Sequence, residues 1–137
     1  MRGNSGGGVN FDNLTFSLKQ EETSLVNRGI ISNADNSSWI VTVDPTKIYL
    51  ITSLQSTGEY YQYDANSFAI NRTALVANGK VIISRGFEQY YNIPAGQYAN
   101  RTIEGGSITL YSTNKIKVPF NFAPNYRYSH IAIYESN

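Results

Sequence analysis

The sequence predicts an all-β protein, an antiparallel β-sandwich of about ten strands, and three observations support this. Short segments alternate between apolar and polar residues, and turn-forming Gly, Pro, Asn and Asp separate them. Charged residues make up only 15% of the chain, so Asn, Ser and Thr supply most of its polar side chains. Aromatic residues, which favour strands, make up 13%. Helical periodicity is almost absent. Residues 17–26, SLKQEETSLV, are the one helical candidate, and we expect them to be irregular.

The predicted organisation is a short tether followed by one domain. The start, MRGNSGGGVN, is rich in glycine, which predicts a flexible tether over residues 1–10 and a single sandwich domain over residues 11–137. A length of 137 residues is enough to bury one core. The tether fits a domain of a longer protein and an expression scar equally well. No apolar run is long enough for a membrane-spanning helix, and we expect no membrane insertion.

Residues 38–54, SWIVTVDPTKIYLITSL, form the clearest unit. Trp39, Val41 and Val43 share one face of the first strand, because successive side chains in a strand point to opposite sides. The segment DPTK supplies a turn, in which Pro45 fixes one backbone dihedral angle. Both faces of the return strand carry apolar residues, which predicts a central place in a sheet.

The rest of the chain continues this pattern of strand and turn. After the turn DANS, the segment SFAIN places Phe68 and Ile70 on one face, and Asn78-Gly79 is a strong hairpin signal. In KIKVPFNF, Pro119 suggests a strand at a sheet edge, because proline has no N–H to donate to a neighbouring strand. The side chains that we expect to be largely buried are Trp39, Val41, Leu50, Phe68, Ile70, Ile83, Ile131 and Ile133.

Alternation also divides the tyrosine clusters between two faces. In EYYQYD, Tyr61 and Tyr63 point the same way and are expected to pack inward, whereas Tyr60 points to the polar side. In FEQYYNI the same rule gives two sets. The apolar set is Phe87, Tyr91 and Ile93, and the outward set is Glu88, Tyr90 and Asn92.

Three segments occur in an order that has a counterpart in a known family. They are WIVTVDPTKIYLITS, YYQYDANSFAINRT and GFEQYYNIPAGQYANRTI. A strand after a Pro-containing turn (Tyr49–Ser53), a tyrosine-rich hairpin (Tyr61–Ile70) and a segment around PAG (Tyr91–Arg101) resemble carbohydrate-binding-module-like jelly-roll domains of phage tail and baseplate proteins. The resemblance covers about residues 38–103, and Asn100 departs from it by interrupting the alternation after PAG.

This resemblance implies a jelly-roll sandwich that binds a glycan or cell-surface polysaccharide without fixing which sugar. It also implies a larger parent chain or tail assembly, located outside the cell or on the virion surface.

The residues give little sign of an enzyme. His130 is the single histidine and there is no cysteine, so every histidine-dependent nucleophile would rely on His130, which lies in a strand pattern typical of a structural histidine. The acidic residues are scattered, with no sign of the two facing carboxylates of a glycosidase. We therefore expect no catalytic residues.

The charge of the chain and its acidic residues bear on whether it binds nucleic acid or a metal ion. The net charge of +1 offers no basic field for nucleic-acid phosphates. Asp35, Asp44 and Asp64 lie near turns, where a structural calcium ion is conceivable, but no loop alternates oxygen ligands as a calcium site does. We expect no cofactor and no bound metal.

The last strand, in NYRYSHIAIYE, leaves an aromatic surface. If Ile131 and Ile133 point inward, alternation turns a row outward that consists of Tyr126, Tyr128, His130 and Tyr134. Sugar rings pack on aromatic faces, while amides, carboxylates and arginines bind their hydroxyls. The glycan-binding residues that we expect are Tyr60, Gln62, Glu88, Tyr90, Tyr126, Arg127 and Tyr128.

Three functions stay open. The first is a non-catalytic carbohydrate-binding or adhesion module of a phage tail or bacterial surface assembly. The second is a structural domain without a small ligand, whose aromatic face joins it to another subunit as a homo-oligomer. The third, and least favoured, is a carbohydrate-active enzyme. Self-association without sugar would distinguish the second from the first.

Overall fold

The protein is described by a computed structural model over residues 13–58, 67–92, 97–102, 108–121 and 126–137, with the backbone alone for residues 90–92 and 97–102. These residues form antiparallel strands and no α-helix, which confirms the all-β prediction. The strands are β1 (Phe16–Glu22), β2 (Ile31–Ala34), β3 (Ser38–Thr42), β4 (Tyr49–Ser56), β5 (Ser67–Ala77), β6 (Lys80–Asn92), β7 (Gln97–Thr102), β8 (Thr109–Ser112), β9 (Lys115–Pro119) and β10 (Tyr128–Ser136).

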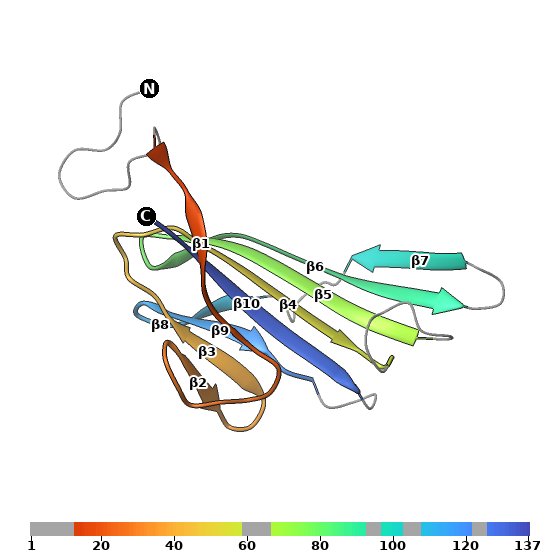
Figure 1. Ribbon diagram of the computed structural model, residues 1–137. Helices are drawn as coiled ribbons and strands as arrows, with labels where there is room; N and C mark the ends of the chain where they lie inside the picture. The colour runs from red at the N-terminus through yellow and green to blue at the C-terminus, as the bar shows by residue number, and fades with distance from the viewer. Residues whose placement is uncertain (1–12, 59–66, 93–96, 103–107, 122–125) are drawn as a thin grey trace.

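The strands build two sheets that pack face to face, as in a β-sandwich (Figure 1). The six-stranded sheet has the order β1-β10-β4-β5-β6-β7, and the four-stranded sheet has the order β2-β3-β9-β8. The start of β1 and the C-terminus lie at one end of the molecule, and the β6–β7 hairpin lies at the other (Figure 1).

The chain passes back and forth between the two sheets, and this corrects one expectation about residues 38–54. The first strand and the return strand of that segment are not neighbours in one sheet, because β3 belongs to the four-stranded sheet and β4 to the six-stranded sheet. The turn between them is nevertheless as predicted: the Lys47 N–H donates to the Asp44 carbonyl at 3.1 Å, and the Asp44 carboxylate accepts from Thr46. The central place of β4 is confirmed, since it lies between β10 and β5.

The core fills the space between the sheets. Trp39 is fully buried, and its ring meets Phe120 edge to face, with centroids 4.8 Å apart. Of the side chains expected to be buried, Leu50 and Phe68 are only half-buried. The prediction that Ile83 is buried is wrong, because this residue is 44% exposed. The remaining predictions are confirmed, namely Trp39, Val41, Ile70, Ile131 and Ile133.

The exposure of Ile83 follows from an irregularity in the β5–β6 hairpin. The Asn78-Gly79 turn forms as predicted, with positive φ angles of 55° and 73°. The register then shifts between Leu75 and Val76, so that Ile83 lies opposite Leu75 on the face that points away from the core.

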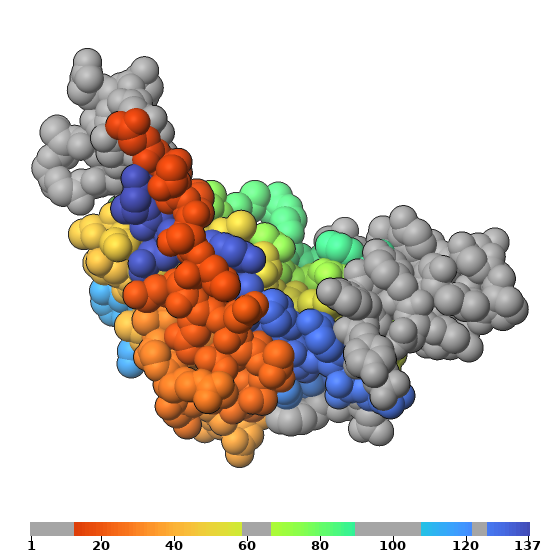
Figure 2. Space-filling model, viewed as in Figure 1, coloured from red at the N-terminus to blue at the C-terminus, as the bar shows by residue number. Residues whose placement is uncertain are grey.

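Residues 17–26 are not irregular throughout, because residues 16–22 form β1. This edge strand pairs with β10, a contact across more than a hundred residues that no local pattern reveals. Phe16 to Lys19 are exposed, and Figure 2 shows the start of β1 projecting beside the C-terminal residues.

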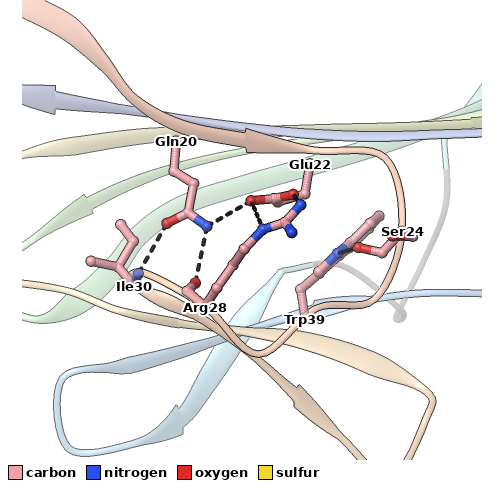
Figure 3. Close-up of polar contacts among 6 residues, drawn as sticks. All are labelled: Gln20, Glu22, Ser24, Arg28, Ile30 and Trp39. Atoms are coloured by element: carbon pink, nitrogen blue, oxygen red, sulfur yellow. Dashed lines mark hydrogen bonds and ion pairs between the residues drawn. The ribbon is translucent and has the colours of Figure 1, made fainter.

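The loop that leaves β1 is held by a set of polar contacts (Figure 3). The Gln20 amide donates to the Arg28 carbonyl at 3.0 Å and accepts from the Ile30 N–H at 2.9 Å, and Arg28 pairs with Glu22. The Trp39 indole N–H donates to the Ser24 carbonyl at 2.9 Å. These contacts tie the loop to both sheets, so they fix the first crossing between the layers.

Pro119 lies in a strand that is not at a sheet edge, since β9 runs between β3 and β8. Among the described pairs, Pro119 lies opposite Ser38 of β3, and the pairs between β8 and β9 end at Lys117. The prediction of an edge strand at Pro119 is therefore wrong, because β9 has a strand on each side.

Candidate functional site

The inner face of the six-stranded sheet, which we define as the face carrying Ile131 and Ile133, changes from apolar to polar along its strands. On β4 the inward residues run from Tyr49 and Ile51 to Ser53 and Gln55. On β5 Arg72 lies opposite Ser53, in phase with the buried Ala74 and Val76. We call the region of Gln55, Arg72, Glu88, Tyr126 and Ser129 the polar end of the sandwich.

Gln55 holds the chain that leads from β9 to β10 against this end. Its side chain is fully buried, donates to the Asn121 carbonyl at 2.9 Å and accepts from the Asn121 N–H at 2.8 Å. The same amide nitrogen donates to the Ser129 hydroxyl at 3.1 Å. The amide oxygen and nitrogen of Gln55 are thus both hydrogen-bonded, and their contacts with the Asn121 backbone make Gln55 a positioning residue.

Arg72 brings a charge into the interior at the polar end. Only 4% of the residue is exposed, which is rare for arginine. Burial disfavours the charged guanidinium and lowers its pKa, while the neighbouring Tyr126 opposes that effect. Glu88 lies on the same face, because it is opposite Ile70, which in turn is opposite Gln55. Arg72 and Glu88 are both engaged in interactions within the protein.

Tyr126 completes the cluster. Burial raises the pKa of its hydroxyl, the positive charge of Arg72 lowers that pKa, and the negative charge of Glu88 raises it, so both charges act on the phenol. The Tyr126 hydroxyl is buried and makes no hydrogen bond, and the same holds for the Ser53 hydroxyl opposite Arg72. Buried hydroxyls in native proteins are normally hydrogen-bonded. The polar end therefore contains two buried hydroxyls that lack a hydrogen bond, one opposite Arg72 and one under the influence of Arg72 and Glu88.

The structure brings together some of the residues that the sequence assigned to glycan binding. Glu88 and Tyr126 meet at the polar end, and Arg127 is exposed beside them, with its N–H donating to the Ser56 carbonyl at 2.9 Å. Tyr60 and Gln62 lie outside the described residues, as do Tyr61, Tyr63 and Asp64. Tyr90 lies in β6 opposite Phe68, and its side chain is outside the described part of the chain.

Tyr128 lies on the opposite, outer face of the sheet. Its ring stacks on His130, with centroids 6.4 Å apart and planes 18° from parallel. The His130 Nε2 lies 3.0 Å from the Glu21 carboxylate, which gives the histidine a partner that the sequence did not reveal. Tyr126 and Tyr128 are thus separated, because strict alternation begins only with β10 at Tyr128.

The predicted division of FEQYYNI is reversed in the part that the structure describes. Phe87 is 39% exposed on the outer face, and Glu88 is on the inner face. The pairing of β6 with β5 sets this choice, since it places Glu88 in the same layer as Gln55 and Ile70.

Sequence reasoning missed Arg72 and Gln55. The alternation of side chains within each strand could have revealed them, because it places Arg72 on the same face as Ile70 and Ala74. In the same way it places Gln55 on the same face as Ile51. A polar residue in phase with a buried stripe must be satisfied inside the protein, so such residues point to polar sites.

The described residues contain no group of three or more His, Asp or Glu side chains placed to hold a metal ion. Asp44 is used in its turn, where its hydrogen bonds to Thr46 lower the pKa of its carboxyl. Asp35 lies in the β2–β3 turn with a positive φ angle of 55°. Over the same residues, no helix is long and apolar enough to span a membrane.

Comparison of the chain with protein-family models, with curated proteins and with solved structures gives no match.

Proposed function

We propose that this protein is a non-catalytic carbohydrate-binding module and that it binds a glycan at the polar end of the sandwich. The observation that carries the proposal is the buried Tyr126 hydroxyl, which has no hydrogen bond and lies under the influence of the charges of Arg72 and Glu88. A sugar offers hydroxyls that donate and accept at once. It can therefore pair with a phenol, a carboxylate and a guanidinium in one place.

The rest of the proposal rests on the sequence resemblance. The ligand is then a cell-surface glycan, and the module belongs to a larger phage tail or bacterial surface assembly, outside the cell or on the virion surface. We also propose that the fold is a variant of the jelly roll. The pairing of β10 with both β1 and β4, and of β9 with β3, supports this, since strands from the two ends of the chain lie side by side in each sheet.

A glycan array probed with the whole chain tests the proposal, followed by calorimetric titration of the sugars that bind. Replacing Glu88 by Gln should weaken binding about tenfold or more, because a hydrogen bond to a charged group is lost. Glu21→Gln is the matched control, since Glu21 is a carboxylate on the outer face.

Two results would count against the proposal. An array without signal up to about millimolar chain concentration, the range of weak binding, would favour the structural domain without a small ligand. A loss of binding in Glu21→Gln but not in Glu88→Gln would move the site to the outer face.

A further inference from the structure

The outer face of the six-stranded sheet carries an apolar row that crosses neighbouring strands from β1 to β6. The register places each member directly opposite the next, from one strand to its neighbour. Its two ends are 47% and 44% exposed, and the three side chains between them are half-buried. We define the apolar row as Leu18, Tyr134, Leu50, Leu75 and Ile83.

The next row along the strands is polar and has opposite charges at its two ends. It begins with Glu21 on β1 and ends with Arg85 on β6, and both residues are exposed. Between them lie Ala132, Thr52 and Thr73, which are small enough to keep the face flat. We call this the charged row.

A third row carries exposed aromatic surface. It contains His130, Leu54, Asn71 and Phe87. In the row beyond it, Ser56, Ala69 and Gln89 are buried within the chain. The open part of the outer face is therefore three rows long.

We propose that this face is the interface of a symmetric dimer with a second copy of the chain. The two-fold axis runs parallel to the strands and lies between the outer faces of the two copies. It leaves the position of each row along the strands unchanged and reverses the order of the strands in the second copy. The apolar row then lies on the apolar row of the second copy, with Leu50 of β4 at the centre. In such an isologous contact every interaction occurs twice.

The charged row supports this arrangement over other occupants. Under the same two-fold operation, β1 of one copy lies over β6 of the other, so Glu21 meets Arg85 of the second copy at both ends of the interface. Twisted sheets pack at about 30° to each other and about 10 Å apart, which shifts the outer strands by only about 5 Å. Glutamate and arginine side chains span such a distance.

The size of the face indicates a reversible dimer. Strands lie about 4.8 Å apart and alternate residues about 6.8 Å, so the open face is about 24 Å wide and about 20 Å long. A footprint of roughly 500 Å² per copy falls below that of a standard stable interface, in the range of transient complexes. The expected association is therefore concentration-dependent, with a dissociation constant in the micromolar range.

The arrangement leaves the polar ends free. Because the axis is parallel to the strands, both copies keep the same direction along it, and both Tyr126 clusters lie at the same end of the dimer. The start of β1 and the end of β10 lie at the opposite end (Figure 1). A dimer of this form would present two copies of the polar end to one surface.

Sedimentation equilibrium of the full chain from about 1 to about 500 µM, without sugar, tests the proposal over the expected range. Leu18→Glu should weaken association at least about tenfold, since it places charges in the apolar row. Leu110→Glu is the matched control, because Leu110 on β8 is 50% exposed against 47% for Leu18. It should change the dissociation constant less than about twofold.

Charge reversal gives a second, independent arm. Glu21→Arg and Arg85→Glu should each weaken association about fivefold to tenfold, and the double variant should restore it, because the contact occurs twice and is rebuilt with its signs exchanged. A chain that stays monomeric throughout, or a dimer that is lost in Leu110→Glu and kept in Leu18→Glu, would overturn the proposal. So would a double variant as weak as the single variants. None of these results bears on sugar binding.

Discussion

Arg28 donates from both Nε and Nη2 to the two carboxylate oxygens of Glu22, the last residue of β1, and so closes the loop over which the chain first crosses between the sheets. The Nε–Oε2 distance is 3.0 Å. Gln20 adds a donor to the same carboxylate at 2.9 Å. The hydrogen bonds from Arg28 and Gln20 lower the pKa of Glu22 from 4.5 to about 2.

This contact predicts a loss of stability in acid. The folded-state pKa of Glu22 is below its unfolded value, so the folded protein binds fewer protons there, and the contribution of Glu22 is complete above about pH 5. It should decline as the pH falls from 4.5 toward 2. Glu22→Gln should lower the free energy of unfolding at neutral pH by about 1 kcal/mol, because Arg28 is largely exposed and screened.

Urea denaturation at a series of pH values measures this effect. The stability difference between the wild type and Glu22→Gln should shrink as the pH falls through that interval. A difference that stays constant from pH 7 to pH 2 would show that Glu22 does not titrate in the way its contacts require.

Gln55 predicts a coupling between the core and the polar end. Gln55→Ala should destabilise the fold by about 2 to 4 kcal/mol, since it leaves the backbone N–H and carbonyl of Asn121 without their partner. Thr52→Ala on the outer face of the same strand is the control and should cost less than about 1 kcal/mol. Chemical denaturation compares the two. Equal losses of unfolding free energy in the two variants would mean that the Asn121 contacts do not stabilise the fold.

Ile51 and Ile83 predict opposite results for one substitution. Ile51 is fully buried, so Ile51→Ala should cost about 2 to 5 kcal/mol of unfolding free energy. Ile83 is 44% exposed, so Ile83→Ala should cost less than about 1 kcal/mol in the monomer. Thermal unfolding at submicromolar concentration, below the proposed dimerisation range, checks both. A large loss in Ile83→Ala would mean that the outer face is covered by the chain itself.

The contrast between these isoleucines also shows what the sequence can and cannot predict. Alternation correctly relates residues within one strand, and it places Ile131 and Ile133 together in the core. It does not say which face of a strand is inward when both carry apolar residues. In β6 the register shift opposite Leu75 and Val76 decides this, and it turns Ile83 and Phe87 outward.

Long-range pairing explains the other differences. β1 forms because β10 offers it an edge, although residues 17–26 carry no strand pattern of their own. Likewise, the turn at Pro45 was predictable from residue types, but the passage from one sheet to the other depends on partners far along the chain. The polar end joins residues of β4, β5, β6 and β10, so no single segment could reveal it.

The central claim is that a sugar hydroxyl occupies the place beside the Tyr126 hydroxyl, and Tyr126→Phe tests it most directly, because it removes one oxygen and keeps the ring. Binding of an array-identified glycan, measured by calorimetry, should weaken about tenfold. Thermal stability should stay equal or rise, since a buried hydroxyl without a hydrogen bond is removed. Tyr128→Phe, on the outer face, should leave affinity unchanged. Unchanged affinity in Tyr126→Phe together with a loss in Tyr128→Phe would contradict the account.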